Sequence, residues 1–243
     1  MLKITSKSNP KIKELKKLLT NKKYRLQEQK FIVEGYHLVQ EAYDAGLLLE
    51  TFEYSAAQPK YSNSILVTQE ILKDLSDTVT PQNIIGVCKF PEVKKHGSKI
   101  LYLDNLQDPG NVGTIIRLAK AFDIDTIYIN QFDYFNPKTI RSSQGAFFSS
   151  NIISGKNGVE FLSKLKEEDF HIYATVLNEK ALALNEVKFP DDKFVIIVGN
   201  EGNGVSLQVQ ELSDTLIYIP ISFESLNVAC ATAIVLDKIR NRG

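Results

Sequence analysis

The chain has 243 residues, of which 43% are hydrophobic and 24% charged, so it is long enough to bury a normal core in one or two domains. No apolar run approaches the roughly 18 to 20 residues that cross a bilayer, which excludes a transmembrane protein. The N-terminus lacks an apolar signal region and the chain has two cysteines, Cys88 and Cys230, which predicts a cytoplasmic protein without a disulfide framework.

The formal net charge of zero hides an uneven distribution. Residues 1–30 contain ten basic and two acidic side chains, a net charge of +8, so the remaining 213 residues carry −8. Such an asymmetry is expected when one end of a protein meets phosphate and the rest does not. A solvated helix face or a basic tail would give the same count, and charge alone leaves these alternatives open.

The first 90 residues predict a small α/β module. Asn9-Pro10 starts an amphipathic basic helix over about 10–20, and a second helical pattern covers about 31–45 and stops at Gly46. Short strands are predicted at 51–54, 64–67 and 84–90, with a helix at about 69–75. The polar stretch 91–98 contains Pro91 and Gly97 and is predicted as the linker.

Beyond the linker, apolar strands alternate with helices. This rhythm predicts an α/β domain over 99–243, with a parallel sheet covered on both faces and ligands bound beyond the carboxyl ends of its strands. The strands are expected at 100–103, 126–129, 171–177, 194–198 and 216–219, and helices at about 112–122, 159–168 and 226–242.

Polar residues and glycines gather where three of these strands end. In the first segment, 103–117, Pro109-Gly110 turns into a helix whose free N–H groups could bind an anion, although Asn111 could simply cap that helix. The second segment, 194–206, has three glycines within six residues but neither the dinucleotide fingerprint nor the P-loop motif.

The third segment, 219–233, precedes the last helix. Ser225 suits its N-cap, and small residues allow close helix packing. Cys230 is expected to be a small buried residue and not a nucleophile, because no histidine lies near it in sequence.

Together and in this order, the three segments resemble the signature motifs of the SpoU (TrmH) family of RNA ribose 2′-O-methyltransferases, in the SPOUT superfamily. The resemblance is carried by DNLQDPGNVGTIIR, VGNEGNGVS and IPISFESLNVACA, and 136–146 also resembles the family. Residues 1–90 are similar to its N-terminal L30e-like RNA substrate-binding domain. Asp123 departs from the family, which commonly has Gly after the first helix.

The resemblance implies a deep trefoil knot in the C-terminal domain, an S-adenosylmethionine cofactor, an RNA substrate, a homodimer, and neither a metal nor a membrane. The implied catalytic residues are Asn111, Arg117, Glu201, Ser225 and Asn227. The implied cofactor-binding residues are Val176, Gly199, Asn200, Ile219, Pro220 and Leu226, and the implied RNA-binding residues are Lys11, Lys13, Lys16, Lys17, Lys22, Lys23, Arg25 and Arg141.

Arg117 has two possible roles in such a reaction. The family's motif 1 arginine is proposed as the base for the ribose 2′-OH, yet a guanidinium is a poor proton acceptor, since its pKa is about 13.8. The other role is to hold a phosphate beside the target ribose.

Other functions stay open at this point. A nucleotide-dependent enzyme could use the glycines at 199–204, and a non-catalytic RNA-binding or ribosome-assembly factor could keep the same scaffold. Within the methyltransferase interpretation, 23S ribosomal RNA is expected over tRNA because of the L30e-like domain.

Overall fold

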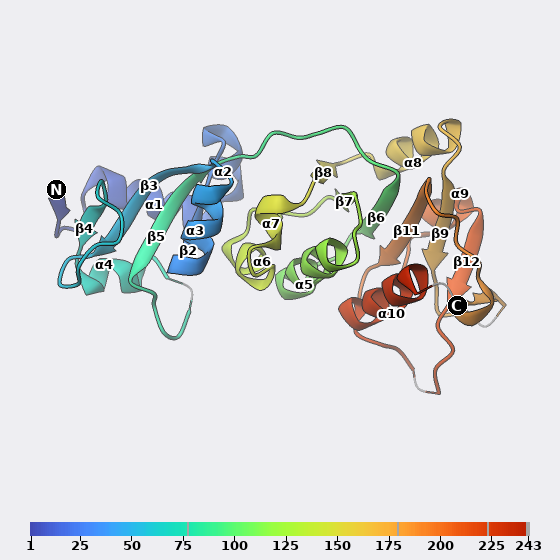
Figure 1. The fold of residues 1–243 in the computed structure, drawn as a ribbon. Helices are drawn as coiled ribbons and strands as arrows, with labels where there is room; N and C mark the ends of the chain where they lie inside the picture. The colour runs from blue at the N-terminus through green and yellow to red at the C-terminus, as the bar shows by residue number, and fades with distance from the viewer. Residues whose placement is uncertain (77, 179, 223, 242–243) are drawn as a thin grey trace. The chain divides into compact units, whose positions relative to one another are not determined.

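The computed structural model describes residues 1–76, 78–178, 180–222 and 224–241, so Phe223 of the third polar segment and the predicted helix end at Arg242 lie outside the described residues. The chain divides into two compact units. The first contains residues 1–92 and 135–149, and the second contains residues 93–134 and 150–243 (Figure 1). Residues 91–98 contain no helix or strand.

A five-stranded mixed sheet in the order β1-β4-β3-β5-β2 forms the centre of the first unit. Its strands are β1 (Lys3–Ile4), β2 (Lys30–Glu34), β3 (Leu48–Tyr54), β4 (Ile65–Val67) and β5 (Ile84–Lys89), and its helices are α1 (Pro10–Thr20), α2 (Lys22–Glu28), α3 (Tyr36–Asp44), α4 (Gln69–Asp74), α6 (Pro137–Ser142) and α7 (Ala146–Ser149).

The basic amphipathic helix predicted at 10–20 is confirmed as α1. The Asn9 side chain caps it by accepting from the Lys11 N–H, and Pro10 takes the first helical position, where its missing N–H costs no hydrogen bond. The apolar side of α1 packs with α4 against the sheet in a cluster that includes Ile12, Leu15, Leu18, Ile71, Leu72, Phe52 and Ile85.

The helix predicted over 31–45 is wrong for its first residues. Residues 30–34 form β2, which pairs antiparallel with β5, and the helix begins only at Tyr36. Phe31, Ile32 and Val33 are all buried, so both faces of this strand are covered and the apolar residues show no alternation. Gly35, with a φ of 98°, makes the turn between strand and helix.

An aromatic cluster joins residues 135–149 to the first unit. The Phe135 ring stacks on Phe90 with a centroid separation of 3.6 Å, and it lies 5.3 Å from Phe31. Phe147 lies 5.5 Å from Phe31 as well. The segment between β7 and β8 therefore contributes core side chains to a unit whose other residues precede it by more than forty positions.

The second unit contains the expected parallel sheet, with seven strands in the order β10-β12-β9-β11-β6-β7-β8 and only parallel pairings between these strands. The strands are β6 (Lys99–Asp104), β7 (Thr126–Asn130), β8 (Ile152–Gly155), β9 (His171–Thr175), β10 (Leu182–Ala183), β11 (Phe194–Gly199) and β12 (Thr215–Tyr218). The helices are α5 (Pro109–Ala121), α8 (Gly158–Glu167), α9 (Leu207–Leu212) and α10 (Val228–Arg240), with the 3₁₀ helix η1 at Leu184–Glu186.

Helices cover both faces of this sheet. Leu162 of α8 and Val209 of α9 pack on one face with Tyr102 and Ile197 of the central strands. Helix α10 packs against α5 and contacts β11 (Figure 1). Near-continuous apolar runs such as Phe194–Val198 are buried because neither face of a central strand meets water.

The structure corrects two helix caps that the sequence suggests and the expected burial of one cysteine. Asp108, and not Asn111, caps α5, because its Oδ1 accepts from the Asn111 N–H at 2.8 Å. Asn227, and not Ser225, caps α10. Cys230 is exposed on α10 and not buried, whereas Cys88 is buried. None of the helices in the described part of the chain has the length and hydrophobicity needed to cross a bilayer.

Candidate active site

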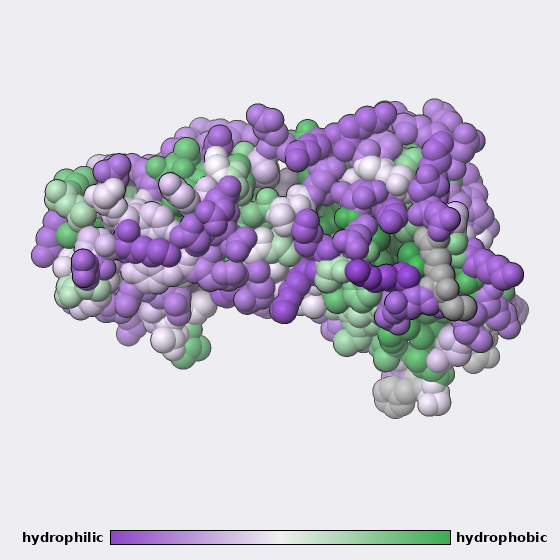
Figure 2. Space-filling model, in the orientation of Figure 1, coloured by the Kyte–Doolittle hydropathy of each residue, from purple (hydrophilic) through white to green (hydrophobic). Residues whose placement is uncertain are grey.

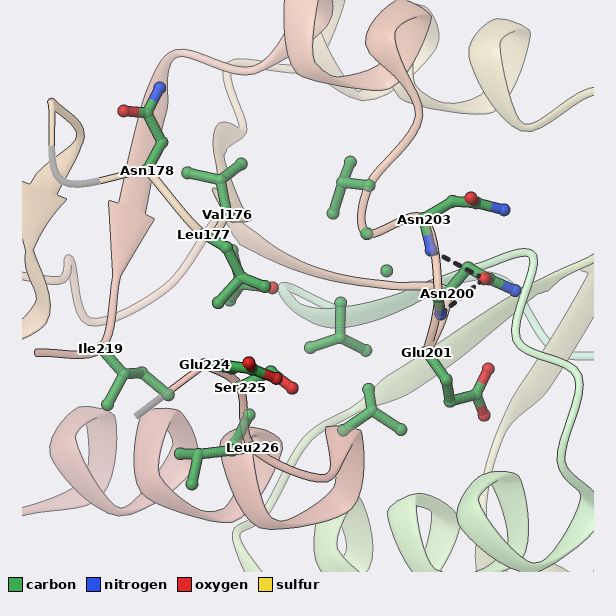
Figure 3. A pocket seen from close by; sticks show the side chains of 18 of the residues that line it. Val176, Leu177, Asn178, Asn200, Glu201, Asn203, Ile219, Glu224, Ser225 and Leu226 are labelled. Carbon is green, nitrogen blue, oxygen red and sulfur yellow. Dashed lines mark hydrogen bonds between the residues drawn. The ribbon is translucent and has the colours of Figure 1, made fainter. Parts of the chain in front are cut away.

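A cavity of about 540 Å³ lies at the carboxyl ends of the central strands of the second unit. Three chain segments form most of its wall: 175–178 at the end of β9, 198–205 around the end of β11, and described residues between 219 and 231 in and before the start of α10 (Figure 3). This is the edge where parallel α/β sheets bind ligands, and the size is that of a small-molecule site.

The Gly199–Val205 loop folds back on itself beside this cavity. The Asn200 N–H donates to the Gly204 carbonyl at 3.0 Å, and the Gly204 N–H donates back at 2.9 Å. The Asn200 Oδ1 accepts from the N–H groups of Gly202 and Asn203, as the dashed lines in Figure 3 show. The side chain of Asn200 thus stabilises the turn by accepting hydrogen bonds from two of its backbone N–H groups.

Gly199 is required by the close approach of this loop. A Cβ atom at Gly199 would lie 2.2 Å from the carbonyl carbon of Gly204 and 2.2 Å from the Val205 nitrogen, both of them backbone atoms. Gly204 has a φ of 68°, in the left-handed region that favours glycine. These two glycines therefore determine the backbone path along the cavity wall.

A buried carboxylate connects the loop to the sheet. Asp104, at the end of β6, is 1% exposed, and its Oδ2 accepts from the Ser206 N–H at 2.8 Å. Its Oδ1 accepts from the side-chain amide of Asn105. The Asn200 side chain in turn donates to the Asn105 carbonyl at 2.8 Å. The first and second polar segments are held together by these bonds.

Three of the implied catalytic residues form one hydrogen-bonded chain. The Asn227 Nδ2 donates to the Asn111 Oδ1 at 3.0 Å, and the Asn111 Nδ2 donates to the Glu201 Oε1 at 3.0 Å. Each residue comes from a different polar segment. These two hydrogen bonds therefore join helix α5, the loop after β11 and helix α10 beside the cavity.

Glu201 is held as a carboxylate at this junction. It also accepts from the backbone N–H groups of Gln107 and Asp108, at 3.3 and 3.4 Å. Burial raises the pKa of Glu201, but these bonds and that from Asn111 outweigh burial and leave its pKa below the ordinary value. Glu201 is therefore a fixed anion and not a group prepared to take up a proton near neutral pH.

The other implied site residues are placed as follows. Val176, Gly199, Asn200, Ile219, Leu226, Glu201 and Ser225 line the cavity. Pro220 is exposed and is not among its described lining residues. Arg117 is exposed on α5, and within the described part of the chain no hydrogen bond or ion pair joins it to the other site residues.

The implied RNA-binding residues divide into exposed and engaged side chains. Lys13, Lys17, Lys22 and Lys23 are exposed. Lys11 pairs with Glu50, and Lys16 pairs with Asp74 at 2.9 Å. Arg141 is partly buried on α6.

Arg25 does not fit its implied role as a surface contact to RNA. It is 3% exposed, and its Nη1 donates to the carbonyls of Leu18 and Leu19 near the end of α1 at 2.6 and 3.2 Å. A cation at this position satisfies helix carbonyls that lack partners. The structure therefore assigns Arg25 to the packing of α1 against α2.

Glu224 was missed by the sequence interpretation, as were Asn178 and Gln210, although all three line the cavity. Glu224 stands between Phe223 and Ser225 in the third polar segment, where nothing in its spacing distinguishes it from a solvated acid. Its position becomes informative only when the segment is seen folded over the ends of β9 and β11.

Comparison with known proteins decides the family. Residues 98–237 match the model of the SpoU rRNA Methylase family, and residues 9–86 match the MRM3-like substrate binding domain. The chain belongs to the SpoU rRNA methylase family. The resemblance carried by the three motifs is thereby confirmed, together with a SPOUT-type parallel sheet, the RNA 2′-O-methyltransferase class and the use of S-adenosylmethionine.

Relatives of this SpoU family member cover its whole length. It is 36% identical to the 23S rRNA (guanosine(2553)-2′-O)-methyltransferase RlmP of Bacillus subtilis, over 99% of this chain and 100% of the relative. A TrmH-family protein from Porphyromonas gingivalis superimposes with a TM-score of 0.85 at 31% identity, over 97% of this chain and 99% of that one. An AdoMet-bound rRNA methyltransferase from Sinorhizobium meliloti superimposes with a TM-score of 0.84 at 26% identity, over 99% and 97%.

The cavity suits this cofactor by its chemistry. Val176, Leu177, Ile219 and Leu226 offer apolar surface to an adenosine and an aliphatic chain, while the turn at 199–204 offers backbone groups. The charged side chains among its described lining residues are both carboxylates, which suits a ligand with a positively charged sulfur.

Proposed function

We propose that this protein methylates a ribose 2′-OH in 23S ribosomal RNA. The observation that carries the proposal is the hydrogen-bonded chain Asn227–Asn111–Glu201, which joins the three polar segments beside the cavity. Support for the RNA comes from the relative in Bacillus subtilis, whose name states a 23S rRNA substrate and whose similarity extends over both units.

S-adenosylmethionine supplies the methyl group when bound. Backbone groups and apolar contacts would hold it, from Gly199, Asn200, Val176, Ile219 and Leu226, and Ser225 lines the same cavity before α10. We assign Pro220 no direct contact, because it is exposed outside the described lining.

Arg117 holds a phosphate next to the target ribose. Its guanidinium is exposed and has no acidic partner among the described residues, so it is free for a bidentate contact that aligns the 2′ oxygen with the methyl carbon. Asn111 and Asn227 orient the segments around this position. Because Glu201 already accepts three hydrogen bonds, its part is to fix the loop.

The exposed lysines near the N-terminus bind the phosphates of the RNA backbone. Lys13, Lys17, Lys22 and Lys23 form no ion pair with described residues, so their charges are available to phosphates. Lys11 and Lys16 can contribute after exchanging their acidic partners, and Arg141 contributes from α6. In this proposal residues 1–90 select the RNA together with 135–149, which belong to the same unit. Residues 91–98 connect, and the rest of 99–243 carries the reaction in the cytoplasm.

A second copy of the chain completes the enzyme. Ile221, Leu226 and Ile234, on and before α10, are each about 40% exposed, and Figure 2 shows hydrophobic surface in this region. Apolar side chains gathered around one helix favour burial against a partner. We also propose the family's trefoil knot for the segment that ends in α10.

The test is methyl transfer from labelled S-adenosylmethionine to purified RNAs, followed by mapping of the methylated nucleotide. We expect label in 23S rRNA, at a ribose 2′ oxygen, and none in tRNA. Label in tRNA would contradict the substrate, and label in a base would contradict the reaction. Binding of RNA without any transfer would favour an assembly factor.

A further inference from the structure

The charged side chains that line the cavity, among the described residues, are all negative. Two of its described lining residues are carboxylates, Glu201 and Glu224, and none of them is Lys, Arg or His. A cavity with this composition favours a cationic ligand over a neutral one of the same shape, because an unbalanced carboxylate lowers the free energy of a nearby positive charge.

The two carboxylates are not equivalent. Glu201 accepts hydrogen bonds from Asn111, Gln107 and Asp108 and belongs to the wall. Glu224 is exposed and forms no hydrogen bond or ion pair across residues 1–76, 78–178, 180–222 and 224–241. Figure 3 shows it next to Ser225, with its carboxylate extending into the space between the segment before α10 and the loop after β11.

The surroundings of Glu224 strengthen its electrostatic effect. Four apolar residues of the same chain segment also line the cavity: Ile219, Ile221, Leu226 and Val228. Once a ligand displaces water there, a carboxylate acts through a medium less polarisable than bulk solvent, and its attraction for a cation increases. A free carboxylate in this place is unfavourable for any ligand without a positive charge.

We propose that Glu224 attracts the sulfonium of bound S-adenosylmethionine and so makes the cavity favour the cofactor over its demethylated product. The two ligands share their adenosine, ammonium and carboxylate groups, and they differ in one methyl group and in the charge on sulfur. A residue can distinguish them by contact with that methyl group or by responding to the charge, and a carboxylate such as Glu224, which lines the cavity, responds to the charge. This inference rests on the cofactor of the family and is independent of which RNA is methylated.

The role is selection and product release, and not acceleration of the methyl transfer. The positive charge on sulfur decreases as the methyl group moves to the ribose oxygen, so the attraction to Glu224 is stronger before the transition state than in it. Glu224 therefore increases affinity for the cofactor and, after transfer, loses its attraction for the neutral sulfur. The product is then displaced more readily by fresh cofactor.

The test compares the affinities of the full chain for S-adenosylmethionine and S-adenosylhomocysteine by calorimetry. Glu224→Gln removes the charge at nearly constant shape, Glu224→Asp keeps it, and Glu211→Gln removes a charge from the exposed side of α9, outside the described lining. We expect Glu224→Gln to weaken the cofactor about fivefold and to leave the product within about twofold of wild type. Glu224→Asp and Glu211→Gln should keep the wild-type ratio, and thermal melting should show all variants folded.

Salt provides a second readout. Raising the ionic strength should reduce the preference of the wild-type protein for the cofactor and leave the Glu224→Gln ratio unchanged. An equal decrease of affinity for both ligands in Glu224→Gln would overturn the proposal, because the carboxylate would then serve a group that both ligands carry. Unchanged affinity for both would overturn it too. Failure of the wild-type protein to bind either ligand would contradict the cofactor assignment itself.

Discussion

The side-chain amide of Asn227 donates to the side-chain oxygen of Asn111 at 3.0 Å, across 116 positions of the sequence. Glu201 fixes the direction of this bond. A carboxylate can only accept, so Asn111 turns its Nδ2 to Glu201 and its Oδ1 to Asn227, which leaves the Asn227 Oδ1 for the first N–H groups of α10. The negative charge of Glu201 thus determines, through Asn111, how Asn227 caps α10.

The two functions of Asn227 can be separated by substitution. Asn227→Asp keeps an oxygen that caps α10 but removes the donor to Asn111, whereas Asn227→Ala removes both. We expect Asn227→Ala to lower the free energy of unfolding by about 1 kcal/mol, and Asn227→Asp to stay within about 0.5 kcal/mol of wild type. Both should be unable to transfer the methyl group. Full activity of Asn227→Asp in a labelled-methyl assay would show that the bond to Asn111 is not needed.

Arg117 should matter for transfer and not for the cofactor. Because it does not line the cavity, Arg117→Ala should abolish methyl transfer to RNA while the dissociation constant for S-adenosylmethionine stays within about twofold of wild type. Arg117→Lys should restore little activity, since an ammonium cannot form the bidentate contact. Substantial methyl transfer by Arg117→Ala would contradict the assignment of Arg117 to the active site.

Gly199 and Gly202 form a matched pair for testing the loop. An added methyl group at Gly199 meets backbone atoms at 2.2 Å, whereas at Gly202 the nearest atom is the Asn200 Oδ1 at 3.6 Å. Gly199→Ala should therefore abolish cofactor binding and destabilise the fold by about 1 to 3 kcal/mol, and Gly202→Ala should bind normally. Calorimetry and urea unfolding measure the two effects. Equal cofactor affinity and equal stability of the two variants would contradict the close approach of Gly199 to the backbone of Gly204 and Val205.

The exposed lysines should act through the salt dependence of RNA binding. Replacing Lys13, Lys17, Lys22 and Lys23 with Gln should decrease the slope of log affinity against log salt by about 0.7 to 0.9 for each RNA phosphate that is no longer neutralised. Cofactor binding should not change. Arg25→Gln is expected to behave differently, lowering stability without a specific change in slope, because Arg25 is buried. An unchanged slope in the fourfold variant would remove α1 and α2 from the RNA interface.

The carboxylate at Glu201 should make stability depend on acid pH. The pKa of Glu201 is lower in the folded protein than its ordinary value of 4.5. The Glu201 carboxylate therefore stabilises the fold fully above pH 4.5, and this stabilisation is lost as the pH falls through the pKa of the folded state. The difference in Tm between wild type and Glu201→Gln should therefore be largest near neutral pH and shrink below about pH 4.5. A difference that is constant with pH would mean that Glu201 acts through shape and not charge.

The sequence predicted the parts of this protein that depend on local pattern. Helix α1 follows from Asn9-Pro10 and apolar spacing, and the central strands follow from apolar runs such as Phe194–Val198. The apolar run of β2 predicts a helix because a short apolar run fits the period of a helix and that of a strand, and its partner β5 lies more than fifty positions away. The local sequence around β2 does not show that this segment pairs with a strand so far along the chain.

The site was predictable where residue types are unusual and not where geometry selects among ordinary ones. Asn111, Glu201 and Asn227 belong to three motifs that resemble those of the SpoU family, and that resemblance implied their place in the site. Glu224 was not predicted, because only the folding of its segment over β9 and β11 brings its carboxylate to the cavity. The resemblance implies that Arg25 binds RNA, but its side chain is buried, and neither a motif nor a count of basic residues reveals which one faces inward.

The aromatic cluster of Phe31, Phe90, Phe135 and Phe147 bears on how the chain folds as it is made. A protein synthesised from its N-terminus usually completes one domain before the next emerges from the ribosome. Here the first unit lacks part of its core until Ser149 has emerged, by which time β6, α5 and β7 have already been translated. Expressing residues 1–92 alone would leave Phe31 without the ring of Phe147 and Phe90 without the ring of Phe135, so the folding unit of this half of the protein is longer than its continuous sequence suggests.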